Sequence, residues 1–113
     1  MIRVIIESPY AAANGKTVAE HEEYARRCMA DSLARGEAPY ASHLLYTQPG
    51  VLDDSDPHQR ALGIAAGHAW LKAADFLAVY SDHGISPGMN QRIRLAAATD
   101  MQITTRHIGK DGG

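Results

Sequence analysis

The chain has 113 residues, of which 45% are hydrophobic and 21% are charged, with a formal net charge of -2. This size and composition predict one globular domain with a modest core. The weakly acidic balance does not favour nucleic acid or an anionic membrane as a partner, and no apolar run is long enough to span a membrane. The single cysteine, Cys28, cannot form an intrachain disulfide, and the N-terminus lacks the layout of a signal peptide, so we expect a cytoplasmic protein.

The N-terminal part of the chain predicts a buried strand followed by a helix. Residues 2–7 form a continuous apolar run with β-branched side chains, which is typical of a central parallel strand. Thr17 and Glu20 have the spacing of a capping box, so we expect a helix to begin there. Gly36 is the expected C-terminal cap of this helix, and Cys28 within it is interpreted as a small buried hydrophobic residue rather than a nucleophile.

A second, short strand is predicted at residues 37–41, and a long connection follows it. The connection, residues 42–55, contains several leucines and a tyrosine and is apolar for an exposed segment. Connections of this length in small domains often have a function. We expect this one either to cover a cleft as a lid or to pack on a partner subunit.

The C-terminal half predicts two more helices and two more strands. Asp56 caps the first of these helices and Pro57 begins it, and its predicted apolar face comprises Leu62, Ala65, Ala66, Ala69, Trp70 and Ala73. Ser86 and Pro87 repeat this arrangement at the start of the last helix, whose inward-facing residues are Met89, Ile93, Ala96 and Ala97. The strands are predicted at residues 76–81 and 101–107, and residues 109–113 are predicted to be a flexible tail.

Strands and helices therefore alternate along residues 1–108, which form a single domain. This alternation predicts an α/β fold with a parallel sheet, right-handed crossovers and helices on both faces. We expect a three-layer flavodoxin-like or Rossmann-like sheet of about four or five strands, with the first strand central.

Three segments are expected to meet at the carboxyl edge of this sheet, where open α/β folds bind ligands. The predicted binding residues are Ser8, Pro9 and Tyr10 after the first strand, Ser42 and His43 after the second, and Asp82, Gly84, Ser86, Gly88, Met89 and Asn90 after the third. The serines offer hydroxyl groups, the tyrosine a stacking ring, and the glycines a close approach of the backbone. Each of these residues, taken singly, is equally well interpreted as an ordinary turn residue.

Acidic residues at strand ends are the candidates for catalysis. Asp82 is placed to accept hydrogen bonds from ribose hydroxyls or to orient a base, and Glu7 is a second, weaker candidate. Arg92 and Arg94 lie past the first turn of the last helix, and a solvated helix face is the favoured interpretation of both. The six histidines do not show metal-ligand spacing, so we predict neither a metal nor another cofactor. A GxSxG motif, a GxGxxG motif and a phosphate-binding loop are also absent from the sequence.

Two turns resemble those of the nucleoside 2-deoxyribosyltransferases and their small, uncharacterised, phage-type relatives. The first is Ile5-Ile6-Glu7-Ser8-Pro9-Tyr10, which resembles the family's hydrophobic strand and its small-residue, proline and aromatic turn. The second is Asp82, Gly84 and Gly88-Met89-Asn90, which resembles an acid, a glycine turn and the family's Gly-Met-Glu. The resemblance implies a flavodoxin-like fold and a cleft shaped for a nucleoside or a ribose phosphate. It also implies a homo-oligomer, because neighbouring subunits of that family often complete the site.

The position of the family's nucleophilic glutamate is matched here by Asn90, and a neutral amide cannot form a glycosyl-enzyme at useful rates. The first hypothesis is therefore a binding protein that holds, and in a phage setting sequesters, a nucleotide, nucleoside or ADP-ribose-like ligand without covalent chemistry. The alternative is an enzyme that transfers or hydrolyses N-glycosidic bonds, with Asp82 or Glu7 activating water. A third interpretation is an interaction domain that uses residues 42–55.

Overall fold

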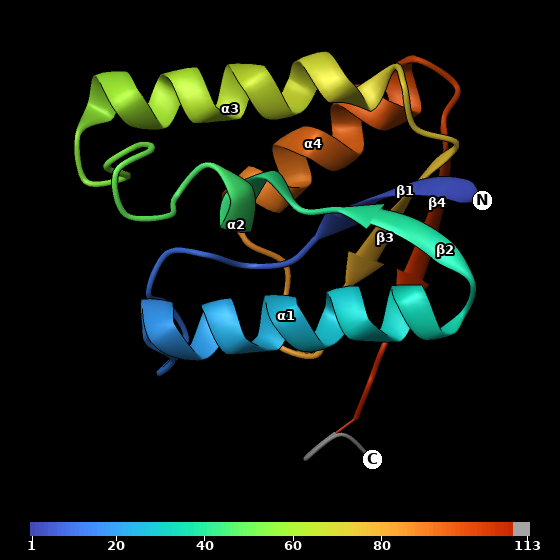
Figure 1. Cartoon of the computed structure of the whole chain (residues 1–113), viewed down its shortest axis with the longest axis horizontal. Coiled ribbons are helices and arrows are strands. Elements are labelled where there is room, and N and C mark those ends of the chain that lie inside the picture. The colour runs from blue at the N-terminus through green and yellow to red at the C-terminus, as the bar shows by residue number, and fades with distance from the viewer. Residues whose placement is uncertain (110–113) are drawn as a thin grey trace.

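A computed structural model describes residues 1–109 and has a four-stranded, all-parallel sheet with the strand order β2-β1-β3-β4 (Figure 1). The strands are β1 (Ile2–Glu7), β2 (Glu37–Tyr40), β3 (Phe76–Tyr80) and β4 (Gln102–Arg106). The prediction of a three-layer α/β fold is confirmed, and the first strand is central as expected. The predicted tail begins at Gly109, the last described residue, and residues 110–113 lie outside the described part.

Helices cover both faces of the sheet. Figure 1 shows α1 (Val18–Ala34) below the sheet, and α3 (Pro57–Leu71) and α4 (Pro87–Ala98) above it. Alternate residues of β1 and β3 divide between two buried clusters. One cluster packs on α1 and contains Val4, Ile6, Tyr24, Cys28, Ala41, Ala78 and Tyr80. The other packs under α3 and α4 and contains Ile5, Leu71, Leu77, Val79, Met89 and Ala96. Cys28 is fully buried, as expected for a structural cysteine, and burial raises the pKa of its thiol to about 12.

The predicted helix starts are present as hydrogen-bonded caps. The Thr17 hydroxyl accepts from the Glu20 N–H at 3.1 Å while the Thr17 N–H donates to the Glu20 carboxylate at 3.0 Å. The Asp56 carboxylate accepts from the His58 N–H at 3.0 Å. The Ser86 hydroxyl likewise accepts from the Met89 N–H at 3.2 Å. Each cap satisfies an N–H group that the helix itself leaves unpaired, so these starts are set by local sequence.

Two expectations about the middle of the chain are corrected. The predicted connection of residues 42–55 begins with a short helix, α2 (Ser42–Leu45), whose N-cap Ala41 makes no side-chain cap and so gave no signal. The predicted apolar face of α3 is wrong, because Leu62 and Trp70 are 61% and 52% exposed. The buried residues of α3 are Gly67 and Leu71. A glycine facing the sheet carries no hydrophobic signal, so the pattern of alanines was misleading.

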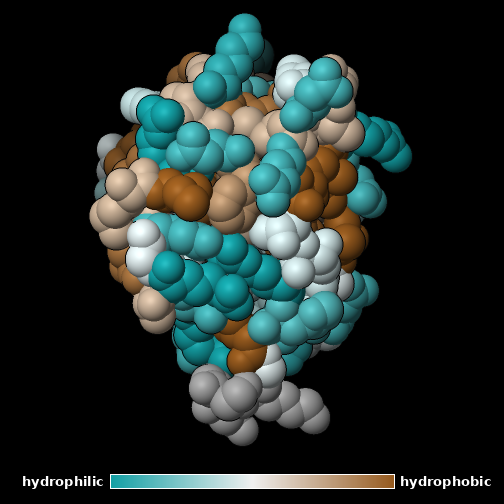
Figure 2. All heavy atoms as spheres, turned by 90° about the vertical axis from the view of Figure 1, so that its right-hand side faces the viewer, coloured by the Kyte–Doolittle hydropathy of each residue, from teal (hydrophilic) through white to brown (hydrophobic). Residues whose placement is uncertain are grey.

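Figure 2 shows the side of the molecule where the chain begins: hydrophobic and hydrophilic residues are interspersed in its upper half, and hydrophilic residues dominate its lower half. The large cavity described below lies instead where β1 and β2 end. No helix within residues 1–109 is long and apolar enough to cross a membrane.

Candidate functional site

A cavity of about 400 Å³ lies at the carboxyl edge of the sheet. Its walls come from the end of β1, from α2 and the loop after it, from the N-terminal half of α3 and from the first turns of α4. The structure brings eight of the predicted residues to these walls: Glu7, Ser8, Tyr10, Ser42, His43, Ser86, Gly88 and Met89. The three loops thus converge on one space, because parallel strands end at the same edge.

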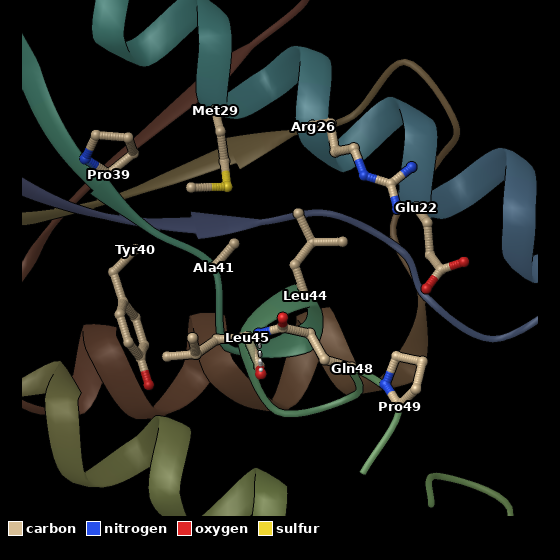
Figure 3. Close-up of a pocket in the computed structure, with 10 residues that line it drawn as sticks. All are labelled: Glu22, Arg26, Met29, Pro39, Tyr40, Ala41, Leu44, Leu45, Gln48 and Pro49. Carbon is tan, nitrogen blue, oxygen red and sulfur yellow. Dashed lines mark hydrogen bonds between the residues drawn. The ribbon is translucent and has the colours of Figure 1, made fainter. Parts of the chain in front are cut away.

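A second hollow, of about 430 Å³, lies beside edge strand β2 (Figure 3). Tyr40, Leu44 and Met29 are among its lining residues, together with Glu22 and Arg26 from α1. None of the predicted site residues contributes to its lining. The candidate site is therefore the cavity at the carboxyl edge, and this hollow is a separate feature.

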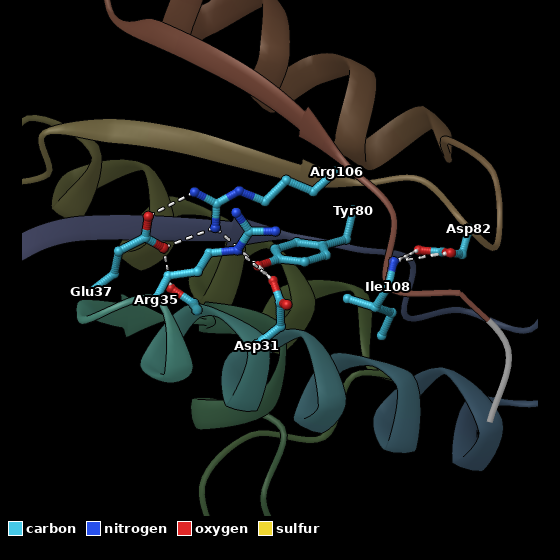
Figure 4. A network of polar contacts seen from close by, with 8 residues as sticks. Asp31, Arg35, Glu37, Tyr80, Asp82, Arg106 and Ile108 are labelled. Carbon is cyan, nitrogen blue, oxygen red and sulfur yellow. Dashed lines mark hydrogen bonds and ion pairs between the residues drawn. The ribbon is translucent and has the colours of Figure 1, made fainter. Parts of the chain in front are cut away.

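Pro9, Asp82, Gly84 and Asn90 are not among the residues that line the cavity. Asp82 points toward α1, where its carboxylate accepts a hydrogen bond from the Tyr24 hydroxyl. It also accepts from the N–H groups of Ile108 (Figure 4) and Gly109, at 3.1 and 3.0 Å. Burial opposes ionisation of Asp82, but these hydrogen bonds hold its pKa below the ordinary value. The structure thus places Asp82 away from the cavity walls, where it ties β3 to α1 and to the segment after β4.

A buried ion network lies on the same side of the sheet (Figure 4). The guanidinium of Arg106 donates to both carboxylate oxygens of Glu37, at 2.8 and 2.7 Å, and to the Tyr80 hydroxyl at 3.0 Å. Ser32 donates to Glu37 at 2.7 Å, and the Tyr80 hydroxyl donates to Asp31 at 2.7 Å. Hydrogen bonds from Arg106 therefore hold the pKa of Glu37 below its ordinary value, although burial opposes this. The network links β2, β3 and β4 to α1.

Arg92 is the cavity residue that the sequence interpretation missed. It was expected on a solvated helix face, but it is 6% exposed and lines the cavity, whereas Arg94 is exposed as expected. The Arg92 Nη1 atom lies 3.2 Å from Oε2 of Glu7. Arg92 follows buried Met89 by three residues, which is the helical spacing that brings side chains to one face. Arg92 of α4 therefore lines the cavity, whereas Asn90 does not.

Glu7 contributes a carboxylate to the cavity, whereas none of the lining residues of α4 is acidic. Its side chain comes from the last residue of β1 and is 9% exposed. Burial raises the pKa of Glu7 to about 7, while the positive charge of Arg92 acts in the opposite direction. A carboxyl group whose pKa lies near neutrality exchanges protons readily at physiological pH, which suits a general acid or base.

The raised pKa of Glu7 predicts a specific pH dependence of stability. The folded protein keeps this proton up to about pH 7, whereas the unfolded chain releases it near 4.5. The stability contributed by protonated Glu7 is therefore complete below pH 4.5 and is lost as the pH rises to about 7. Urea unfolding across this range is expected to show wild type losing stability relative to Glu7→Gln. A constant difference between the two proteins would contradict the assignment.

Ser8 and His43 form a direct contact inside the cavity. The Ser8 Oγ atom lies 2.7 Å from Nε2 of His43, and Ser8 is 5% exposed. Burial and the nearby positive charge of Arg92 lower the pKa of His43 to about 4, so its imidazole is neutral at pH 7. The two residues are 35 positions apart. They meet because the fold brings the end of β1 close to α2, and no local sequence motif predicts this contact.

Two nitrogen atoms of cavity-lining residues have no protein partner. The Nε atom of Arg92 and the Nδ1 atom of His68 are buried without a hydrogen bond. A Cβ atom built on Gly67 would lie 2.6 Å from Nη2 of Arg92 and 2.8 Å from Oγ of Ser42, so only glycine leaves room for this arrangement. Buried polar groups normally find partners, and the unpaired ones therefore indicate where a water or a ligand atom binds.

The loop after α2 forms one wall of the cavity. Tyr46, Thr47, Leu52 and Asp54 line it, as expected if this segment covers a cleft. The Tyr46 hydroxyl accepts hydrogen bonds from the Tyr40 hydroxyl at 2.7 Å and from Trp70 Nε1 at 3.1 Å. Asp54 pairs with Arg60 at 2.8 Å. These contacts hold the loop against α3 and β2.

The family model of a domain of unknown function, DUF7768, matches residues 2–106. The chain belongs to the DUF7768 family. The match spans all four strands and all four helices, so every residue that lines the cavity lies within the matched part. No curated protein matches the chain. Within residues 1–109, no group of three or more histidine, cysteine or acidic side chains is arranged so that it could hold a metal ion.

Proposed function

We propose that this protein binds a nucleoside, nucleotide or ADP-ribose-like molecule in the cavity, without covalent transferase chemistry. The main support is the pair of unpartnered buried nitrogens, Arg92 Nε and His68 Nδ1, in a cavity that also contains serine hydroxyls. Sugar hydroxyls both donate and accept, so they can pair with the Arg92 donor and with either tautomer of His68. Tyr10 and Tyr46 also line the cavity and offer rings on which a base can stack.

The charges of the cavity favour the uncharged nucleoside among these ligands. Its two arginines are each paired with a carboxylate, Arg92 with Glu7 and Arg60 with Asp54. Above pH 7, where Glu7 is ionised, the cavity therefore has no surplus positive charge to balance a phosphate. The turns that resemble those of the nucleoside 2-deoxyribosyltransferases are consistent with the same ligand class.

Calorimetry with the common ribonucleosides and deoxynucleosides, their 5′-monophosphates and ADP-ribose tests this proposal. At least one nucleoside is expected to bind and to be recovered unchanged. Arg92→Gln is expected to weaken this binding by about tenfold or more, because a hydrogen bond from a charged donor contributes about 1.5–3 kcal/mol. Arg94→Gln is the matched control, since Arg94 lies two residues further along the same helix and is exposed. Absence of binding by the entire panel would refute the proposal.

Cleavage of an N-glycosidic bond is a second candidate function, favoured by one observation. Glu7 places a carboxyl group with a pKa of about 7 in the cavity, where it could activate water. Chromatography of nucleosides, nucleoside monophosphates and NAD incubated with the protein distinguishes the two functions. Release of free base by wild type, and its loss in Glu7→Gln, would establish the enzyme and would rule out binding alone.

A further inference from the structure

Two serine–histidine hydrogen bonds occur within residues 1–109, and they differ in environment. Ser8 and His43 meet in the cavity, with 2.7 Å between Oγ and Nε2. Ser81 and His107 meet on the surface, with 3.0 Å between the same atoms. The exposed pair is expected to have no more reactivity than a serine in water. The buried pair lines the cavity of about 400 Å³, so a substrate bound there lies close to the Ser8 hydroxyl.

The geometry of the buried pair suits proton transfer from serine to histidine. Ser8 directly follows β1 and is 5% exposed, and His43 lies in the first turn of α2. The neutral imidazole accepts the Ser8 proton at Nε2 when its own proton is on Nδ1. Arg92 and the N-terminal turn of α4 at Gly88 line the same cavity.

We propose that Ser8 is a nucleophile and His43 its general base, and that together they take an acyl group from an ester bound in the cavity. The Ser8 oxygen attacks the carbonyl carbon while its proton passes to Nε2 of His43. The bond from that carbon to the alcohol oxygen breaks, and the alcohol leaves with the proton from the imidazolium. Water then attacks the acyl-serine, the carboxylic acid leaves, and Ser8 regains its proton.

This reaction is independent of nucleoside binding and goes beyond it. No motif in the sequence indicates it, because Ser8 follows the first strand in an ordinary turn rather than in a nucleophile elbow. The nucleoside proposal rests on unpartnered buried nitrogens, whereas this one rests on the Ser8–His43 contact. The two proposals can therefore fail separately: calorimetry tests the first, and covalent labelling tests the second.

A fluorophosphonate probe tests the nucleophile directly. Reaction joins the Ser8 oxygen to phosphorus, expels fluoride and transfers the serine proton to His43, so intact-mass spectrometry and peptide mapping report it. A single adduct is expected, on Ser8, and Ser8→Ala is expected to remove it. His43→Gln retains a hydrogen-bonding side chain without the basic nitrogen, and it is expected to slow labelling by at least about tenfold. Ser81→Ala is the matched control and is expected to label like wild type.

Three outcomes would overturn the proposal. They are a folded wild type without a Ser8 adduct, equal labelling of Ser8 and Ser81, and a folded His43→Gln variant that reacts at the wild-type rate. Circular dichroism establishes whether each variant is folded. If the cavity variants do not fold, the comparison of Ser8 with Ser81 inside one wild-type molecule still decides the question.

Discussion

Replacing Arg106 with alanine is expected to lower the free energy of unfolding by about 3–5 kcal/mol, the usual cost of removing one partner from a buried ion pair. The side chains of Arg106 and Glu37 are only 10% and 12% exposed, and Arg106 is the only charged partner of Glu37 within 4 Å in the described part. Without it, the carboxylate stays buried with the Ser32 hydroxyl as its remaining partner. Urea unfolding followed by circular dichroism measures the loss.

Arg35→Ala is the matched control for this experiment. Arg35 pairs with Asp31 at 2.9 Å in the neighbouring part of the network, but its side chain is 47% exposed. Exposed pairs contribute about 0–1 kcal/mol, so this variant is expected to be nearly as stable as wild type. Equal losses in the two variants would show that burial does not determine the strength of the network.

The effect of Arg106→Ala is also expected to depend on pH. The folded-state pKa of Glu37 lies below its unfolded value of 4.5 because Arg106 donates to its carboxylate. The stability gained from this group is therefore present above pH 4.5 and is lost as the pH falls through the folded-state pKa. The difference between wild type and Arg106→Ala is expected to shrink below pH 4.5, in the opposite sense to the pH effect predicted for Glu7.

Gly67→Ala is expected to cost up to about 2 kcal/mol, although alanine is the better helix former. Overpacking costs about 1–3 kcal/mol, and the gain in helix propensity returns about 1 kcal/mol. The added Cβ would meet Arg92 Nη2 at 2.6 Å and the Ser42 Cβ at 3.0 Å. Arg92 cannot move away freely, because its guanidinium is buried against Glu7. We expect the variant to unfold at lower urea concentration than wild type.

Gly63→Ala provides the comparison on the same helix. A Cβ atom at Gly63 would lie 3.1 Å from Cδ1 of Leu52, which is the tip of a partly exposed loop side chain and can shift. This variant is expected to be unchanged or up to about 1 kcal/mol more stable than wild type. Equal stability of Gly67→Ala and Gly63→Ala would contradict the close packing of Arg92 against α3.

The fold was predictable because its determinants are local. Capping residues at Thr17, Asp56 and Ser86 mark the helix starts, and the apolar run of residues 2–7 identifies a strand covered on both sides. Alternation of the elements then requires parallel strands with crossovers. The errors arose where a small residue faces the core. Gly67 gives no hydrophobic signal, and the alanines of α3 fit either side of the helix equally well.

The site was only partly predictable, because the direction of each side chain depends on strand parity. Tyr80 packs toward α1, and Asp82, two residues later, points the same way and leaves the cavity. Ile5 packs under α3 and α4, and Glu7 follows it to that side. The period of two in a strand could have distinguished the two acids. The contacts of Glu7 with Arg92 and of Ser8 with His43 span 85 and 35 residues, so sequence pattern alone could not identify them.

The hydrogen bond between Trp70 and Tyr46 gives the protein an intrinsic optical reporter. Trp70 is the only tryptophan in the chain, and its indole N–H donates to a tyrosine that lines the cavity. Any ligand that displaces Tyr46 alters the polarity around the indole and therefore shifts its fluorescence emission. Occupancy of the site can thus be followed by titration of the unlabelled protein.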